Sequence, residues 1–331
     1  MSDELHMRRA IGNAATVRMH TSPNPWVGAV LVTADGRTFD GATEPPGGRH
    51  AEIVALDAAR DAGASIAGST IVTTLEPCSH TGRTGPCTLA LVEAGVSRVV
   101  MSLDDPDPQV AGSGRAALQA AGVSVTTGVL ADEVSHQLRP YLHHRSTGRP
   151  FVVLKLASTL DGRTSAADGS SQWITGPLAR TEVHRLRAES DAIIVGAGTV
   201  RADDPALTTR LVDGPSPRRV VLGQAPAGAK VHPCLEWSGT LPELLETLGS
   251  DGVVQAMVEG GATVAASFHR EGLVDRYVMH IAPALMGGDD GAPLLRGRGA
   301  DTIGDLTALN LVGLRQLGDD IEIVLEKKPH E

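Results

Sequence analysis

The sequence predicts two α/β domains in one chain. The chain has 331 residues, whereas a domain ordinarily holds about 100–200. Extended and helical patterns alternate through both halves, and a polar stretch at residues 132–150, ending in Ser, Gly and Pro, separates them. Strands that alternate with helices imply helices packed on the faces of a sheet. We place the first domain at residues 1–147 and the second at residues 148–331, with residues 132–150 as a connection.

The first half contains repeated rounds of helix and strand. An amphipathic stretch at residues 3–19 precedes an apolar run at residues 27–32. A segment of helical period at residues 51–62 then precedes a β-rich stretch at residues 69–75. Two more rounds follow, in which the helical patterns "TLALVEAG" and "GRAALQAAG" close on the glycine that helix C-termini favour. These patterns predict a layered domain.

The second half begins with the apolar stretch "FVVLKLAS" at residues 151–158. The patterns "DAIIVGAGTV", "RRVVLG" and "VVQAMVEGG" continue it as strands followed by turns or helices. Two extended patterns, "RYVMHIAP" and "IEIVLEK", close the chain. We expect a second α/β sheet that ends in antiparallel strands.

The composition favours a soluble enzyme that acts on a small molecule. The hydrophobic share is 41%, and no run approaches the roughly 18 apolar residues of a membrane span. The N-terminus lacks a basic-then-apolar secretory signal, so we expect a cytoplasmic protein and no membrane partner. A net charge of −10 and an aromatic content of 2% argue against a nucleic-acid partner.

Three cysteines are too few for a disulfide framework, and a close pair in a reducing compartment favours a metal site. Cys78 and Cys87 lie in "PCSHTGRTGPC", and His50 lies in "HAE". Thiolates and imidazole are ligands that zinc prefers, and a catalytic zinc keeps its fourth position open. Glu52 can carry protons beside such a metal. This order of residues is typical of zinc-dependent nucleobase deaminases.

A closed, purely structural zinc site is the alternative interpretation, with His80 as the fourth ligand. It leaves Glu52 without a role, whereas hydrolytic deamination requires such an acid–base group. The loop between the two cysteines carries His80 and Arg83, and it could recognise a charged substrate. Cys234 has no other cysteine near it in sequence, and we expect it to be inert.

Together with "NPWVG" at residues 24–28, these motifs resemble the deaminase half of the bifunctional deaminase–reductase family of riboflavin biosynthesis. The second half resembles the reductase half of that family through "KLASTLDGR", "SQWITG", "HRLRAESDAIIVGAGTVRADDPALTTR" and "VEGG". The resemblance implies a cytidine-deaminase-like three-layer domain followed by a dihydrofolate-reductase-like domain. It also implies deamination of a phosphorylated diaminopyrimidine, then reduction of its ribosyl side chain to ribityl with NADPH, and a homo-oligomer.

The resemblance also assigns roles to residues, motif by motif. His50, Cys78 and Cys87 match the ligands of Zn²⁺, and Glu52 matches the catalytic proton carrier. The matches to deaminase substrate contacts are Asn24, His80 and Arg83. The matches to reductase substrate contacts are Lys155, Ser171, Arg187, Leu207, Arg210 and Glu259. The matches to NADPH contacts are Ala157, Trp173, Thr199, Asp203, Gly261, Ala262, Thr263, Val264, Ala265, Ala266 and Ser267.

The chain departs from the family pattern in a few places. Thr43 stands where the family usually has a histidine, and Gly85 stands where the cysteine loop usually has a proline. The interval at residues 224–252 is shorter by about one strand and loop, on the side expected for the adenosine end of NADPH. The short interval leaves open a chain in which only the deaminase works and the second domain serves binding or oligomerisation. A deaminase of tRNA or single-stranded DNA is a further alternative, because it would use the same zinc chemistry.

Overall fold

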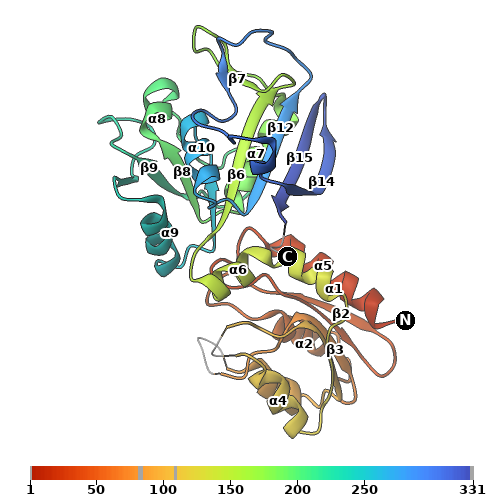
Figure 1. Cartoon of the computed structure of the whole chain (residues 1–331). Helices are drawn as coiled ribbons and strands as arrows, with labels where there is room; N and C mark the ends of the chain where they lie inside the picture. Colours follow the sequence, from red (N-terminus) through yellow and green to blue (C-terminus); the bar gives the residue numbers. More distant parts are fainter. Residues whose placement is uncertain (1, 81–84, 108–109, 329–331) are drawn as a thin grey trace. The chain divides into compact units, whose positions relative to one another are not determined.

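The computed structural model describes residues 2–80, 85–107 and 110–328. The chain divides into two compact units, Met1–Gly148 and Arg149–Glu331 (Figure 1). Each unit has its own sheet and its own helices. No helix in the described parts of the chain combines the length and apolar character needed to cross a membrane.

Unit 1 contains a five-stranded sheet in the order β2-β1-β3-β4-β5. The strand β1 pairs antiparallel with β2 and β3, whereas β3, β4 and β5 run parallel. This is the α/β arrangement that the alternating patterns predicted. The elements are α1 (Asp3–Val17), β1 (Gly28–Val32), β2 (Thr38–Ala42), α2 (Ala51–Asp61), β3 (Thr70–Leu75), α3 (Cys87–Glu93), β4 (Arg98–Leu103), α4 (Ser113–Ala120), β5 (Ser124–Thr126), α5 (Ala131–Gln137) and α6 (Arg139–Thr147).

Two glycines show that α1 and α2 cover opposite faces of this sheet. A Cβ on Gly28 would lie 1.9 Å from the carbonyl oxygen of Ala10 in α1, and one on Gly41 would lie 2.0 Å from that of Ala51 in α2. Gly41 is paired directly with Ala29, the neighbour of Gly28. Adjacent strand positions face opposite sides and paired positions face the same side. The helices therefore form the outer layers of a three-layer unit, each held close to the sheet by one glycine.

The expectation of a polar connection over residues 132–150 is wrong. Most of this stretch forms α5 and α6, which belong to unit 1 and bury Val134, Leu138 and Tyr141. His144 is buried there too. The helix α6 ends at Gly148, whose φ of 72° is the left-handed conformation that glycine adopts readily at a helix C-terminus. Most of the polar residues occupy the outer faces of these short helices, so composition alone concealed their packing.

Unit 2 contains an eight-stranded sheet in the order β10-β9-β8-β11-β6-β12-β15-β14. Its strands run parallel from β10 to β12, and β15 and β14 are antiparallel, which confirms the expected antiparallel finish. The elements are β6 (Phe151–Thr159), β7 (Arg163–Ser165), α7 (Pro177–Ala188), β8 (Ala192–Gly196), α8 (Ala197–Asp203), β9 (Arg218–Leu222), β10 (Leu235–Trp237), α9 (Leu241–Ser250), β11 (Gln255–Val258), α10 (Ala262–Arg270), β12 (Arg276–Ala282), β13 (Ala292–Pro293), η1 (Ile303–Asp305), β14 (Leu309–Leu317) and β15 (Asp320–Lys327).

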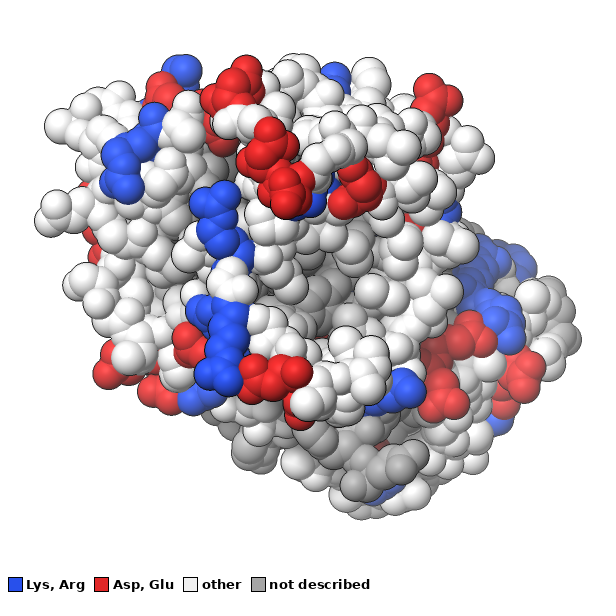
Figure 2. All heavy atoms as spheres, turned by 45° about the horizontal axis from the view of Figure 1, so that its top comes forward, with Lys and Arg blue, Asp and Glu red and all other residues white. Residues whose placement is uncertain are grey.

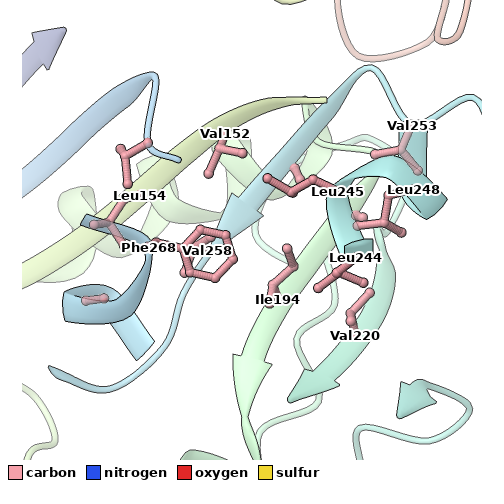
Figure 3. Close-up of a cluster of buried hydrophobic side chains, with 14 of the residues drawn as sticks. Val152, Leu154, Ile194, Val220, Leu244, Leu245, Leu248, Val253, Val258 and Phe268 are labelled. Atoms are coloured by element: carbon pink, nitrogen blue, oxygen red, sulfur yellow. The ribbon is translucent and has the colours of Figure 1, made fainter. Parts of the chain in front are cut away.

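Two hydrophobic cores lie on the two faces of the larger sheet. Val152 and Leu154 of β6 pack on one face with the apolar sides of α9 and α10, among them Leu244 and Phe268 (Figure 3). Phe151 and Val153, the alternate residues of β6, pack on the other face with α7 and α8. A strand buried on both faces reads as a continuous apolar run, as this one does.

The interval at residues 224–252, expected to be short, contains β10 and the helix α9. The strand β10 has three residues and pairs in parallel with β9 at the edge of the sheet. The helix α9 begins at Thr240 with a capping box, in which Thr240 and Glu243 satisfy each other's backbone amides. The shortened interval thus still continues the sheet and covers it with a helix.

Charged side chains of both signs share the surface. In the view of Figure 2, Lys and Arg side chains are interspersed with Asp and Glu among the described residues. The chain as a whole carries a net charge of −10.

Candidate active sites

The first candidate site lies where α2 begins and β3 ends. His50 is the N-cap residue of α2, and Glu52 lies in the first turn of that helix. Cys78 follows β3 by three residues, and Cys87 is the first residue of α3. Three elements therefore bring together four residues that the sequence analysis singled out. Such junctions between strands and helices are typical positions for catalytic groups, because the scaffold is rigid there.

The donor atoms of His50, Cys78 and Cys87 all lie within 4.8 Å of one another. The imidazole Nδ1 lies 3.5 Å from the Sγ of Cys78 and 3.3 Å from the Sγ of Cys87. Zinc bonds of about 2.3 Å to sulfur and about 2.0 Å to nitrogen place tetrahedral ligand atoms about 3.5 Å apart. The donor set therefore fits a zinc ion in both chemistry and spacing, with one coordination position left for water or substrate.

The electrostatics of this cluster also suit a metal. Hydrogen bonding to the Cys87 thiol, and then to His50, lowers the pKa of Cys78 to about 4 despite burial. The hydrogen bond between His50 and the sulfur of Cys78 raises the pKa of His50. Without a cation, two thiols and an imidazole that share one small space cannot all take the forms that bind metal. A divalent ion removes that conflict, because it stabilises both thiolates and the neutral imidazole.

Glu52 lies beside the cluster without entering the donor set. Its side chain is only 3% exposed. Burial, followed by the charge of Cys78, raises the pKa of Glu52 to about 7. A carboxyl group with a pKa near neutrality can both accept and return a proton, which is the behaviour of a general acid–base residue.

The sequence analysis did not single out Glu76, a residue that fixes the segment just before Cys78 through hydrogen bonds to backbone amides. Its buried carboxylate accepts hydrogen bonds from the backbone amides of Asp105, Gly112 and Arg115, at 3.1, 2.9 and 2.9 Å. A Cβ on Gly114 would lie 2.0 Å from the carbonyl oxygen of Pro77. The start of α4 is therefore held tightly against the two residues that precede Cys78. The position of Glu76 directly before "PC" is the one signal in the sequence that could have pointed to this residue.

The remaining residues predicted for this site have mixed outcomes. Asn24 is half-buried in the turn before β1, where its backbone N–H donates a hydrogen bond to the backbone carbonyl of Thr21. His80 is exposed at the start of the loop between the cysteines, and Arg83 lies outside the described residues. Thr43, which replaces the usual histidine, is buried and exchanges hydrogen bonds with the backbone of Val27. Thr43 therefore joins β2 to the segment that leads into β1.

The second candidate site lies in unit 2, where Lys155 of β6, Arg187 of α7 and Glu259 after β11 come together. The guanidinium of Arg187 donates two hydrogen bonds to the Glu259 carboxylate, at 2.9 and 2.8 Å, and a third to the carbonyl of Thr208. Burial lowers the pKa of Lys155, while the nearby charge of Glu259 opposes that effect. These residues are far apart in sequence, yet they form one charged cluster.

The loop after α8 lies beside this cluster. The amide nitrogen of Arg210 donates to Nδ1 of His184, a buried histidine that the sequence analysis did not single out. Burial, and then the charge of Arg187, lowers the pKa of His184 to about 4. Leu207 is buried with a φ of +53°, a conformation that residues with a Cβ rarely adopt. Such backbone positions cluster at functional sites.

Ser171 and Trp173 lie in the lining of an open pocket of about 290 Å³. Thr159 at the end of β6, and Leu285 and Met286 after β12, complete much of its wall. The indole of Trp173 is 66% exposed, and the guanidinium of Arg180 stacks over it at 4.9 Å. This exposed aromatic ring is available to a planar ligand.

The N-terminus of α10 follows β11 through Gly260 and Gly261. A Cβ on Gly260 would lie 2.9 Å from the Cβ of Val264, so glycine allows the close turn. The N-cap residue Gly261 offers no side-chain cap, and its own amide donates to Thr199. A helix N-terminus without a side-chain cap, behind two glycines, suits an anionic phosphate group. Ala157 lies in β6, and Asp203 is the exposed last residue of α8.

Two protein-family models match the two halves of the chain. The family model "RibD C-terminal domain" matches residues 150–323, and "Cytidine and deoxycytidylate deaminase zinc-binding region" matches residues 1–103. The chain is 45% identical over 295 residues to riboflavin biosynthesis protein RibD of Mycobacterium tuberculosis (strain ATCC 25618 / H37Rv), covering 85% of each chain. It is 38% identical over 364 residues to RibD of Escherichia coli (strain K12), covering 97% of this chain and 98% of the other.

Solved structures give the same result across the whole chain. Acinetobacter baumannii RibD, form 1, is 35% identical with a TM-score of 0.92 and 99% of each chain covered. A diaminohydroxyphosphoribosylaminopyrimidine deaminase/5-amino-6-(5-phosphoribosylamino)uracil reductase of Thermotoga maritima is 30% identical with a TM-score of 0.92, covering 98% of this chain and 99% of that one. These matches confirm the fold class. The chain therefore belongs to the RibD family of riboflavin biosynthesis enzymes and carries both the deaminase domain and the reductase domain of that bifunctional family.

Proposed function

We propose that unit 1 deaminates 2,5-diamino-6-(5-phosphoribosylamino)pyrimidin-4(3H)-one by hydrolysis, and that unit 2 then reduces the ribosyl side chain of 5-amino-6-(5-phosphoribosylamino)uracil to ribityl with NADPH. The observation that carries the first step is the placement of a buried carboxyl group, Glu52, beside two thiols and an imidazole. A structural zinc site has no use for such a group.

In the deaminase site, His50, Cys78 and Cys87 would hold a zinc ion. The zinc ion, when bound, supplies Lewis-acid activation of the attacking water. Glu52 takes a proton from that water and returns it to the departing amine, so that ammonia leaves in neutral form. Its burial keeps bulk water from competing for the proton. Glu76 and α4 hold Cys78 in place behind the reacting groups.

We assign recognition of the phosphorylated pyrimidine to Asn24, His80 and Arg83. Asn24 lies in the turn before β1, and a side-chain amide can pair with the edge of a pyrimidine ring. His80 and Arg83 are carried by the loop between the cysteines, where cationic groups suit the 5′-phosphate. The exposure of His80 leaves it free to face a ligand.

In the reductase site, NADPH supplies the hydride. The N-terminus of α10, with residues Gly261 to Ser267, would receive the pyrophosphate of the cofactor, and Ala157, Trp173, Thr199 and Asp203 would contact the rest of it. Lys155, Arg187 and Glu259 would contact the sugar phosphate, together with Ser171, Leu207 and Arg210. The paired charges of Arg187 and Glu259 orient each other before the substrate arrives, which reduces the ordering required on binding.

A chain in which only the deaminase works remains the alternative. The cluster of Lys155, Arg187 and Glu259 argues against it, because a domain kept for binding or oligomerisation has no need of a charged cluster built around a buried arginine. The shortened interval was the reason for this alternative, yet β10 is still present and pairs with β9 at the edge of the sheet.

The change Glu52→Gln tests the deaminase mechanism. Glutamine keeps the size of the side chain but cannot exchange a proton, so we expect the rate of ammonia release to fall by about 10²–10⁴-fold. Zinc content, measured by mass spectrometry of the metal, should stay unchanged because Glu52 is not a ligand. The matched control is Glu93→Gln, an exposed acid at the end of α3. Deamination that survives Glu52→Gln would contradict the mechanism.

A further inference from the structure

A second group of metal-binding side chains lies in unit 2, beside the edge strand β10. It consists of His232, Cys234 and Glu236, whose donor atoms all lie within 4.8 Å of one another. The Sγ of Cys234 lies 3.5 Å from Nδ1 of His232, the same separation that joins Cys78 to His50 in the deaminase site. None of the three residues belongs to the deaminase site or the reductase site.

The local sequence "HPCLE" explains why these side chains meet. Glu236 lies in β10, and His232 and Cys234 lie in the segment that leads directly into that strand, so the three side chains are close in sequence and meet at its start. The strand β10 is the edge of its sheet, and the side chains of His232 and Glu236 are exposed there. Contrary to the expectation that Cys234 is inert, a histidine and a carboxylate lie two residues away on either side of it.

Backbone contacts orient two of the three side chains as ligands. Nε2 of His232 lies 3.1 Å from the carbonyl oxygen of Pro226. Since a carbonyl can only accept, Nε2 carries the proton, and Nδ1 keeps a lone pair directed toward Cys234. One carboxylate oxygen of Glu236 accepts from the amide of Ala225 at 2.9 Å, and the other oxygen stays available. Ligating histidines and carboxylates are typically held by such outer contacts.

The turn that provides these contacts is itself held in place. The amide of Ala229 donates to the carbonyl of Pro226, and the amide of Lys230 donates to the carboxylate of Asp204. Cys234 packs against the hydrophobic core on the α7 face of the sheet, which fixes the position of its sulfur. His232 and Glu236 are exposed, so their side chains can rotate to shorten the remaining separations.

We propose that His232, Cys234 and Glu236 form a second site for a thiophilic divalent cation such as Zn²⁺, with solvent as the fourth ligand. One sulfur, one imidazole nitrogen and one carboxylate oxygen are ligands of the types that zinc binds. On binding, the thiol proton passes to solvent and the sulfur bonds to the metal as thiolate. Burial, and then the charge of Glu236, raises the pKa of the free Cys234 thiol, while Arg219 opposes this. A cation between the two groups offsets that cost.

The bound ion joins the turn after β9 to β10. Its solvent-exposed position and single thiolate predict weaker binding than at the deaminase site, which has two thiolates and a more buried donor set. The site therefore exchanges its metal more readily, and it stabilises the edge of the sheet in the interval at residues 224–252 without taking part in deamination.

Zinc content per chain tests the proposal directly. The full-length protein is equilibrated against buffered Zn²⁺, separated from free metal and analysed for zinc by mass spectrometry. We expect two zinc ions per chain. Cys234→Ser and His232→Ala should each bind one ion and keep full deaminase activity. Cys78→Ser should also bind one ion but lose deamination. The matched control His20→Ala, an exposed histidine in unit 1, should still bind two.

Thiol alkylation followed by peptide mapping gives an independent measurement on the unaltered protein. Bound Zn²⁺ should slow the alkylation of Cys234 by about tenfold or more, because the metal occupies the sulfur. The effect should disappear in His232→Ala. A content of one zinc ion per chain that depends on Cys78 alone would overturn the proposal. So would a second ion that persists in both Cys234→Ser and His232→Ala.

Discussion

Arg187 and Glu259 of unit 2 form an ion pair that is largely shielded from solvent. Burial raises the pKa of Glu259, but the neighbouring charge and hydrogen bonds of Arg187 lower it by more. Arg187 is itself only 8% exposed. A buried pair of this kind contributes little net stability, because desolvation offsets the attraction. Its value lies in holding two charged groups in a fixed geometry for a ligand.

The change Arg187→Lys tests that geometry. Lysine keeps the charge but cannot donate the two parallel hydrogen bonds to Glu259, which are worth about 1.5–3 kcal/mol for a charged group. We expect kcat/KM for the NADPH-dependent reduction to fall by about 10- to 100-fold. Deamination should not change, since it takes place in the other unit. Nicotinamide absorbance and ammonia release measure the two reactions separately.

The control for this prediction is Arg185→Lys in the same helix. Arg185 pairs with Glu182 and Glu189 rather than with Glu259. Its replacement should leave both activities within about twofold of the unaltered enzyme. Equal losses in Arg187→Lys and Arg185→Lys would indicate a general disturbance of α7 and would remove the special role of Arg187.

Glu322 of β15 is the residue whose protonation should affect the stability of unit 2. It lies opposite His280 and Arg315 on the two neighbouring strands and contacts both side chains. Burial raises its pKa, but hydrogen bonds from His280 and Arg315 outweigh burial and lower the pKa from 4.5 to about 2. The folded state thus holds the carboxylate form, and this stability is complete above pH 4.5 and is lost as the pH falls toward 2.

The free energy of unfolding, measured by urea denaturation at several pH values, should decrease for the unaltered protein as the pH falls below 4.5. Glu322→Gln should be less stable at neutral pH and should show a flatter dependence in that range, because no proton is taken up there. Asp319→Asn, an exposed acid in the adjoining turn, is the control and should retain the slope of the unaltered protein. An unchanged slope in Glu322→Gln would refute this assignment.

At the scale of elements, the position of α2 determines whether the metal ligands meet. His50 precedes α2, and that helix rests directly on Gly41 of β2. In Gly41→Ala the new Cβ would lie 2.0 Å from the carbonyl of Ala51, so the start of α2 must move. We expect a loss of about 2 kcal/mol or more in stability. Zinc content and deamination should fall as well, whereas reduction should persist.

The control uses a glycine that has room around it. In Gly12→Ala of α1 the added Cβ meets nothing within 4 Å. Alanine favours the helix over glycine by about 0.5–1 kcal/mol. Thermal denaturation should therefore show opposite shifts for the two substitutions. A zinc content that stays unchanged in Gly41→Ala would mean that α2 does not position His50.

Local patterns were enough to predict most elements, and they singled out three residues that the structure brings together as a possible metal site. The stretches that became α1, α2, β1 and β3 carry clear periodicity, and His50, Cys78 and Cys87 carry a distinctive spacing. The short strand β2 was missed, since "TFDGA" has neither length nor alternation. The helices α5 and α6 were missed because their buried residues are spaced among many polar ones.

Contacts between distant segments were beyond local patterns. Glu76 acts through amides 29, 36 and 39 residues away, so only the fold reveals its role. His184 and Arg210 are 26 residues apart and meet through a loop. Cys234 is the opposite case, because its partners are two residues away. That cluster was predictable from the short spacing of its three residues.

At the scale of the whole molecule, the chain carries two chemistries in two units. Each unit has its own sheet, and the sites predicted for deamination and reduction lie in different units. Substitutions in one unit should therefore leave the other reaction intact, as the predictions above require. The product of deamination is the substrate proposed for reduction, so the two reactions should follow each other on one protein.

The most direct test follows ammonia and NADPH together. The purified full-length protein, loaded with zinc, is given the diaminopyrimidine 5′-phosphate substrate and NADPH. We expect one ammonia released and one NADPH oxidised for each substrate, with ammonia appearing first, and no oxidation of NADPH before deamination has begun. Ammonia release with no oxidation of NADPH, even when the deaminated intermediate is supplied to the folded protein, would contradict the account.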